Sequence, residues 1–212
     1  MAFDYNIVRS NRKTISVSVS SDNTITVRCP YSMDVFAIDS FLDSKSDWLF
    51  KVLAENNIKR SDNESILNFK EIFVGGNKVP LIFADNNKIE RDAVYVKNVA
   101  SIKRTFTKYL SAGLINFATD ISNQVKLRAK GFSVRSYKAR WGCCDKKGII
   151  TFNCILMMLP LYLQRYVIIH ELCHTVHFNH SQKFWKLVEK FEPNYKFCRK
   201  KLKSFNYLTK LY

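Results

Sequence analysis

The stretch His170-Glu171-Leu172-Cys173-His174, followed by Thr175-Val176-His177-Phe178-Asn179-His180, decides how this 212-residue chain is interpreted, because it holds all four of its histidines. Two residues four apart differ by roughly 40° around a helix, so His170 and His174 leave the same face. Glu171 lies about 100° round, beside them. This H-E-x-x-H pattern predicts a helix whose two imidazoles share one zinc ion, with a glutamate next to the metal.

The third ligand is predicted from distances along the helix axis. His177 returns to the same face but lies about 10 Å along the axis from His170, too far for both rings to lie about 2.1 Å from one zinc ion. His180 reaches the metal only if the chain turns before it. Asn179 tolerates the left-handed conformation that ends a helix, so we place the turn there. His177 is left either as a residue of the cleft near the ligands or as a solvated residue at the helix end.

The predicted site therefore has three metal ligands, His170, His174 and His180, and one catalytic residue, Glu171. Three neutral imidazoles leave Zn²⁺ its full charge and one open position, where a water with a pKa of about 7 can supply hydroxide. Glu171 takes the proton and passes it to the leaving group. Residues open as stabilisers of the resulting oxyanion are Arg140, Tyr137, Tyr195 and His177.

Hydrophobic periodicity organises the rest of the chain into strands and helices. It predicts a hairpin within 5–28, one helix over 34–55 capped by Asp34, a polar linker over 56–65, a hairpin over 71–83, more strand over 88–96, a long helix over 98–123, strands over 132–137 and 149–152, and an apolar helix leading into the histidines. An edge strand beside the metal would suit capture of an extended peptide. An ordinary structural hairpin is the equal alternative.

Several separated motifs resemble those of the YgjP-like metallopeptidase family, which are small metal-dependent hydrolases of the zincin type. The motifs are Arg140-Trp141-Gly142-Cys143-Cys144, Asn153, the H-E-x-x-H pattern, and Asn179-His180-Ser181-x-x-Phe184-Trp185. The similarity runs along nearly the whole chain, and one departure is a cysteine where the family usually has a serine. The resemblance implies an α+β fold with a zincin-like core, in which a long helix and the H-E-x-x-H helix lie against a small β-sheet. It places an N-terminal β-rich portion with one helix at 1–97 and the catalytic domain at 98–212.

The function predicted from these motifs is that of a zinc-dependent metallopeptidase acting on peptides or proteins. A metal-dependent nucleoside triphosphate (UTP) pyrophosphatase is the alternative that the resemblance also allows. A second alternative is a nucleic-acid-associated protease or binder of the related SprT-like group. The formal charge of +16 fits nucleotide or nucleic-acid partners, but a bias in amino-acid composition, or the solvated faces of two basic helices near the C-terminus, explains it equally.

Arg140-Trp141 has two interpretations: an arginine that binds an anionic substrate or transition state, or an arginine paired with a buried carboxylate beside a core tryptophan. The six cysteines show no C-x-x-C pair and are read as reduced thiols, and Cys143 and Cys144 are weak candidates as soft metal ligands. Without a signal-peptide pattern or an apolar run long enough for a membrane span, the expected location is the cytoplasm.

Overall fold

The computed structural model of the protein describes residues 3–20 and 22–212, which divide into two compact units, Met1–Glu64 and Ser65–Tyr212. The predicted division at 97/98 instead falls inside the second unit. The reason is that Leu81, Val94 and Val96 share one core with the long helix that follows them. We call the two parts unit 1 and unit 2.

Unit 1 is a three-stranded sheet with helices. Its elements are β1 (Tyr5–Ser10), β2 (Ser16–Val19), β3 (Ile25–Pro30), α1 (Val35–Asp43) and α2 (Ser46–Asp62). The central strand β3 runs parallel to β1 and antiparallel to β2, so the expected hairpin is present. Alternate residues of β3 are buried and form a small core with the two helices; this core contains Ile25, Val27, Cys29, Ile38, Leu42 and Leu49.

The helical part of unit 1 differs from the prediction in two places. The Asp34 carboxylate caps α1 as expected, accepting a hydrogen bond from Ala37 N at 2.7 Å. However, α1 ends at Asp43 and α2 begins at Ser46, so the single helix predicted over 34–55 is wrong. The polar linker is wrong as well, because residues 56–62 continue α2. Their polar side chains form hydrogen bonds within the unit: Asn56 Nδ2 donates to Ser20 O at 3.0 Å, and Asn57 Oδ1 accepts from Asn23 Nδ2 at 2.6 Å.

Unit 2 holds two further sheets and the remaining helices. Its elements are α3 (Glu64–Leu67, beginning at the boundary), β4 (Glu71–Val74), β5 (Asn77–Phe83), β6 (Lys88–Ile89), β7 (Val94–Val96), η1 (Val99–Ser101), α4 (Ile102–Val125), β8 (Gly131–Arg135), β9 (Gly142–Cys144), β10 (Ile149–Asn153), η2 (Cys154–Met158), α5 (Leu161–Cys173), α6 (Gln182–Phe191), α7 (Tyr195–Ser204) and α8 (Leu208–Leu211). One sheet has the order β4-β5-β7-β6 and the other β8-β10-β9.

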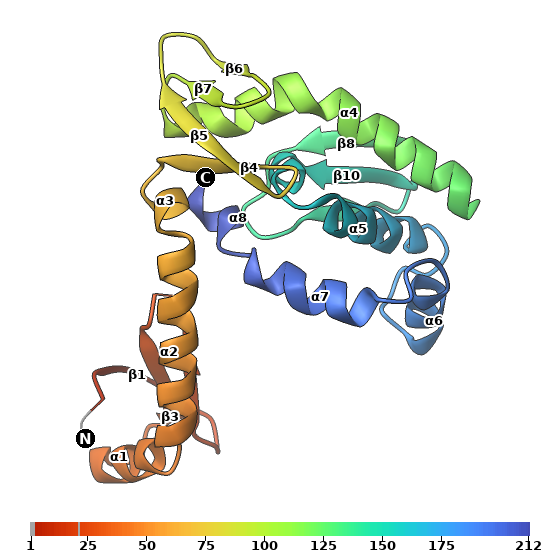
Figure 1. The fold of residues 1–212 in the computed structure, drawn as a ribbon. Helices are drawn as coiled ribbons and strands as arrows, with labels where there is room; N and C mark the ends of the chain where they lie inside the picture. The colour runs from red at the N-terminus through yellow and green to blue at the C-terminus, as the bar shows by residue number, and fades with distance from the viewer. Residues whose placement is uncertain (1–2, 21) are drawn as a thin grey trace. The chain divides into compact units, whose positions relative to one another are not determined.

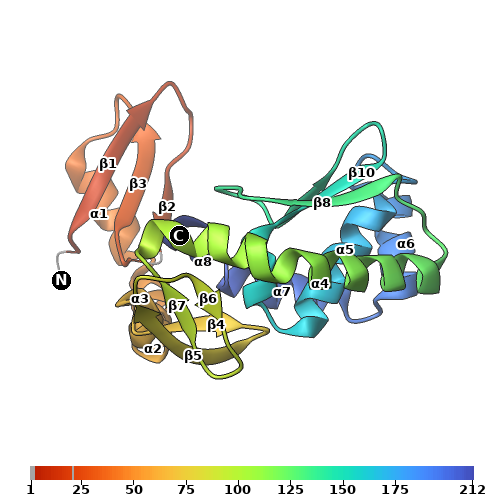
Figure 2. The same ribbon diagram turned by 90° about the horizontal axis from the view of Figure 1, so that it is seen from above.

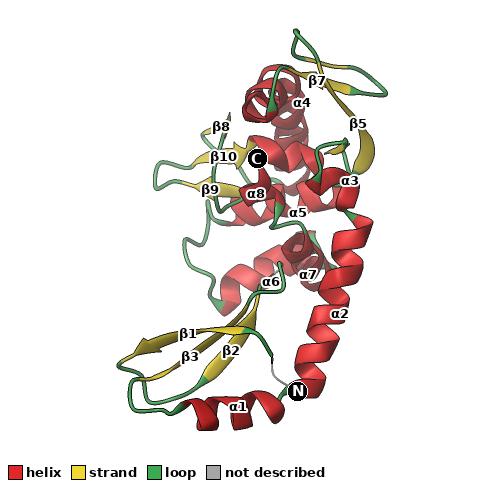
Figure 3. Ribbon diagram, turned by 90° about the vertical axis from the view of Figure 1, so that its left-hand side faces the viewer, coloured by secondary structure: helices red, strands yellow, loops and turns green. Residues whose placement is uncertain are grey.

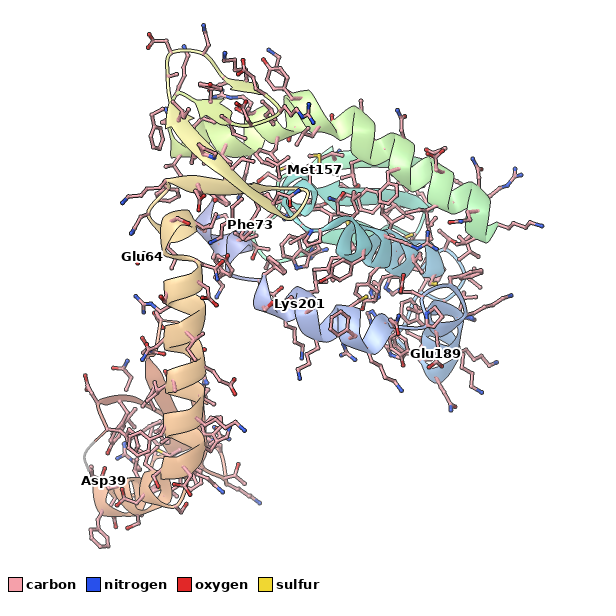
Figure 4. The ribbon with its side chains drawn as sticks, viewed as in Figure 1. Asp39, Glu64, Phe73, Met157, Glu189 and Lys201 are labelled. Atoms are coloured by element: carbon pink, nitrogen blue, oxygen red, sulfur yellow. The ribbon has the colours of Figure 1, made fainter. Side chains whose placement is uncertain are left out.

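Two helices contact the outer strands of the second sheet. Helix α4 contacts β8 and α5 contacts β9, and the two helices contact each other (Figure 3). Helices α6 and α7 also contact α5 (Figure 1). The other sheet lies near the N-terminal end of α4, with β6 against the helix (Figure 2). The packed interior between these layers includes Phe73 of β4 and Met157 of η2, both labelled in Figure 4. None of the helices in the described ranges is long and apolar enough for a membrane span.

The start of α5 is fixed by a close backbone contact. At the turn between β4 and β5, Gly75 N and Gly76 N each donate at 2.9 Å to the carbonyls of Met157 and Met158. Gly76 has φ +89° and approaches Pro160 so closely that a Cβ would lie 2.6 Å from its Cγ. Only glycine satisfies both demands. This contact holds the segment from which α5 runs toward the histidines.

Candidate metal centre

Three histidines bring their ring nitrogens together at the C-terminal end of α5. His170 lies in the last turn, His174 is the C-cap residue, and His180 follows six residues later. Ligand atoms of these three rings all lie within 4.8 Å of one another. His170 Nε2 and His180 Nε2 are 3.1 Å apart. In the described part of the chain, this is the one group of three or more histidine, cysteine or acidic side chains with such spacing.

The turn that returns His180 lies earlier than predicted. Helix α5 ends at Cys173, and residues 174–176 form turns in which Thr175 N and Val176 N donate to Leu172 O and Cys173 O. Asn179 is not among the described residues with positive φ, so the predicted left-handed end at Asn179 is wrong. The chain folds back through right-handed turns instead, and the predicted return of His180 is nevertheless present.

The geometry of the three rings fits a tetrahedral metal ion. Two nitrogens each about 2.1 Å from one zinc ion are about 3.4 Å apart in a tetrahedron, a few tenths of an ångström more than the observed 3.1 Å. His174 Nδ1 lies 3.0 Å from the carbonyl of His177, which fixes its proton there and leaves Nε2 free as a ligand. Thus the backbone of His177, rather than its ring, contacts the cluster. Burial lowers the pKa of His170 to about 3 and also lowers that of His174, so both are in the neutral form that a metal requires.

An aromatic platform holds the rings in place. The Phe184 ring is fully buried and packs against all three imidazoles, with centroid distances of 5.0, 4.5 and 4.8 Å to His170, His174 and His180. Trp185 stacks on His180 at 5.5 Å. Phe184 therefore supports the whole cluster.

Glu171 lies beside the cluster, with only 7% of its side chain exposed. Burial raises the pKa of its carboxyl group to about 7, while Arg140 and the backbone N–H of Cys144 act in the opposite direction. The carboxylate packs on Gly142, where a Cβ would lie 3.0 Å from Glu171 Cγ and 3.2 Å from Oε1. A side chain at position 142 would therefore displace the glutamate.

The histidines and Glu171 open into a pocket of about 320 Å³. Its lining residues are Arg140, Gly142, Cys143, Cys144, His170, Glu171, His174, Phe178 and His180. Of the four residues considered for oxyanion stabilisation, only Arg140 is in this lining. Tyr137 donates to or accepts from Cys143 Sγ at 3.3 Å, and Tyr195 is buried against Trp185. Cys143 and Cys144 line the pocket without joining the histidine group.

Strand β9 forms one wall of the pocket and was not predicted. It is an edge strand, antiparallel to β10, whereas β8 and β10 are parallel and so do not form a hairpin. The buried amide of Asn153 holds the loop before β9, because its Nδ2 donates to Tyr137 O at 3.0 Å and to Arg140 O at 2.8 Å. The signal for this wall was the motif Arg140-Trp141-Gly142 together with Asn153. Its three-residue strand is too short to show a period.

Comparison with known proteins gives one structural match and one family. The crystal structure of the metallopeptidase zymogen of Pyrococcus abyssi abylysin is 27% identical and covers 43% of this chain and 90% of that chain, with a TM-score of 0.36. No curated protein matches. The profile of the YgjP-like metallopeptidase domain matches residues 13–205. Since this range is most of the sequence, the chain belongs to the YgjP-like metallopeptidase family.

Proposed function

We propose that this family member is a zinc-dependent peptidase in which His170, His174 and His180 hold the metal and Glu171 is the general base. Membership of a metallopeptidase family makes it a metal-dependent hydrolase; the choice of zinc, ligands and base is the proposal. The observation that carries it is the convergence of three imidazoles beside one buried glutamate in a single pocket. Three nitrogen ligands with an open position are typical of catalytic zinc sites.

When bound, a zinc ion supplies Lewis acidity and makes water acidic enough to ionise near neutral pH. The chain's own residues then handle the proton. Glu171, with a pKa of about 7, is matched to taking a proton near neutral pH and returning it to a leaving amine. Gly142 and the Cys144 N–H fix where its carboxylate lies. Phe184 packs against the three imidazoles and supports their orientation.

The two other functions considered have weaker support. Enzymes acting on nucleoside triphosphates more often use magnesium held by carboxylates, and within residues 3–20 and 22–212 the histidine group is the one candidate cluster. The cationic surface fits nucleic acid but supplies no chemistry. Release of pyrophosphate from UTP, with no cleavage of any peptide, would decide for the nucleotide hydrolase.

The experiment compares the zinc-loaded wild type with Glu171→Gln on a mixed peptide library read by mass spectrometry. The amide keeps the size of the side chain but cannot accept the proton, so cleavage falls by about a hundredfold or more while bound zinc stays at one per chain. Lys138→Ala, an exposed substitution outside the pocket lining, is the control and keeps full cleavage. Undiminished cleavage by the Glu171→Gln protein would contradict the proposed role.

A further inference from the structure

The positive charge of the protein is confined to the unit that carries the pocket. Residues 65–212 contain 26 Lys and Arg against 9 Asp and Glu, whereas residues 1–64 contain 8 against 9. A general bias in amino-acid composition would have affected both units alike. The difference therefore indicates that the charge of unit 2 serves something bound there.

The charge is dense in the sheet that forms the pocket wall. Residues 126–147 include eight Lys and Arg and a single acidic residue, Asp145. That carboxylate is used by the turn between β9 and β10, where it accepts hydrogen bonds from Lys147 N at 2.8 Å and Ile149 N at 2.9 Å. This segment thus has cations facing solvent and no spare carboxylate to neutralise them.

Arg140 is the member of this group that lines the pocket. Its backbone is fixed, because the buried Asn153 amide donates to its carbonyl at 2.8 Å. Its side chain is exposed and lies 5.6 Å from the centroid of the Tyr137 ring, which it covers as a cation over an aromatic face. Within the described ranges the guanidinium forms no ion pair with a carboxylate. The alternative from the sequence, an arginine paired with a buried acid, is not seen as a direct ion pair, although Arg140 acts on the buried Glu171 over a longer distance and lowers the pKa of that carboxyl group. Trp141 is buried as expected.

A guanidinium held at the mouth of a pocket, with free donors, is suited to a planar anion that it can bind through two parallel hydrogen bonds. Arg140 is the one lysine or arginine in the pocket lining, and the three imidazoles there are the proposed metal ligands. An anionic group on the substrate could bind Arg140 in the same pocket that holds the proposed metal centre.

Resting on the proposed peptidase function, we infer that Arg140 selects substrates carrying a carboxylate next to the scissile bond. The carboxylate belongs either to an aspartate or glutamate side chain or to the free C-terminus of a short peptide. The binding is electrostatic and precedes the reaction, so Arg140 acts mainly on KM. A stabiliser of the transition state would act on kcat instead.

The test uses one acetylated peptide with Glu, Gln or Lys at each position flanking the bond that the wild type cleaves, each with a free or an amidated C-terminus. We expect kcat/KM to be at least about tenfold higher for Glu than for Gln at one flanking position, mostly through KM. If the carboxylate is that of the chain end, the peptide with a free C-terminus is instead cleaved with the higher kcat/KM, and its amidated form loses this advantage. Arg140→Ala removes the preference, Arg140→Glu shifts it toward Lys, and Lys138→Ala retains it.

Binding of the same peptides, measured by calorimetry on zinc-loaded Glu171→Gln protein, gives the same ranking without turnover. Equal affinity for the Glu, Gln and amidated peptides would overturn the inference. So would an Arg140→Ala protein whose kcat falls equally on every peptide with KM unchanged, because that result assigns the arginine to the transition state. If the wild type cleaves no peptide at all, the proposed peptidase function is wrong, whatever the role of Arg140.

Discussion

The two walls of the pocket are built by different means. The helix wall, His170, Glu171 and His174, comes from five consecutive residues at the end of α5, so its geometry is set by the helical repeat. The strand wall, Arg140, Gly142 and Cys144, comes from a three-residue edge strand paired with β10 and from the loop before it, which Asn153 holds. Local geometry supplies the proposed metal ligands, and long-range pairing supplies the surface against which the glutamate and a substrate lie.

The largest effect that separates the two walls is expected at Gly142. Gly142→Val places a branched side chain where a single Cβ would already lie 3.0 Å from Glu171 Cγ, so the carboxylate moves while the histidines do not. We expect turnover to fall by about a hundredfold, as for a misplacement of roughly 1 Å, with zinc still bound at one per chain. Steady-state kinetics and metal analysis measure both quantities.

Gly131→Ala is the matched control for Gly142→Val, because it lies on β8 in the same sheet and a Cβ there meets nothing within 4 Å. It should keep both turnover and zinc. Loss of zinc together with turnover in Gly142→Val would mean that the strand wall shapes the metal centre itself, and the distinction between the walls would fail.

A smaller effect concerns the stability of the metal-free protein. The pKa of Glu171 is raised from 4.5 to about 7, so the native state holds a proton that the unfolded state releases between these pH values. Ionising the buried carboxyl therefore costs stability increasingly from about pH 4.5 upward, and the cost is complete above about pH 7. Glu171→Gln avoids this cost, and we expect it to be about 3 kcal/mol more stable than the wild type at pH 8.

The comparison is made by urea unfolding of both metal-free proteins at pH 4 and pH 8. Below about pH 4.5 the two proteins should have nearly the same free energy of unfolding, since both then carry a neutral side chain. A stability difference that is equal at the two pH values would show that burial against Gly142 does not raise the pKa of Glu171.

The helix wall could be predicted because its information is local. Two histidines four apart define a helical face whatever surrounds them, and the axial distance was enough to choose His180 over His177. The path between them was not predictable from Asn179 alone, because right-handed turns stabilised by backbone hydrogen bonds ended the helix six residues earlier. The capping role of Asp34 and the hairpin over 71–83 were local signals of the same kind, and both are present.

For the strand wall, the sequence identified the motif residues but did not predict that they form a strand. Nothing in Gly142-Cys143-Cys144 alone indicates a strand, since its pairing with residues 150–152 is set by the whole sheet. For the same reason the sequence could not show whether Arg140 is exposed, and so could not decide between its two interpretations. The linker prediction over 56–65 was wrong because the hydrogen-bond partners of these polar residues lie more than thirty residues away in the sequence. Without those partners, an exposed polar helix cannot be told from a linker.

The most direct test of the account is the metal content and zinc affinity of three proteins: the wild type, His180→Ala and His177→Ala. The account predicts one zinc per chain in the wild type, a loss of affinity on the order of a hundredfold or more in His180→Ala, and little change in His177→Ala, whose backbone carbonyl still orients His174. A wild type that binds no stoichiometric zinc after reconstitution, or equal losses in both variants, would contradict the three-histidine centre.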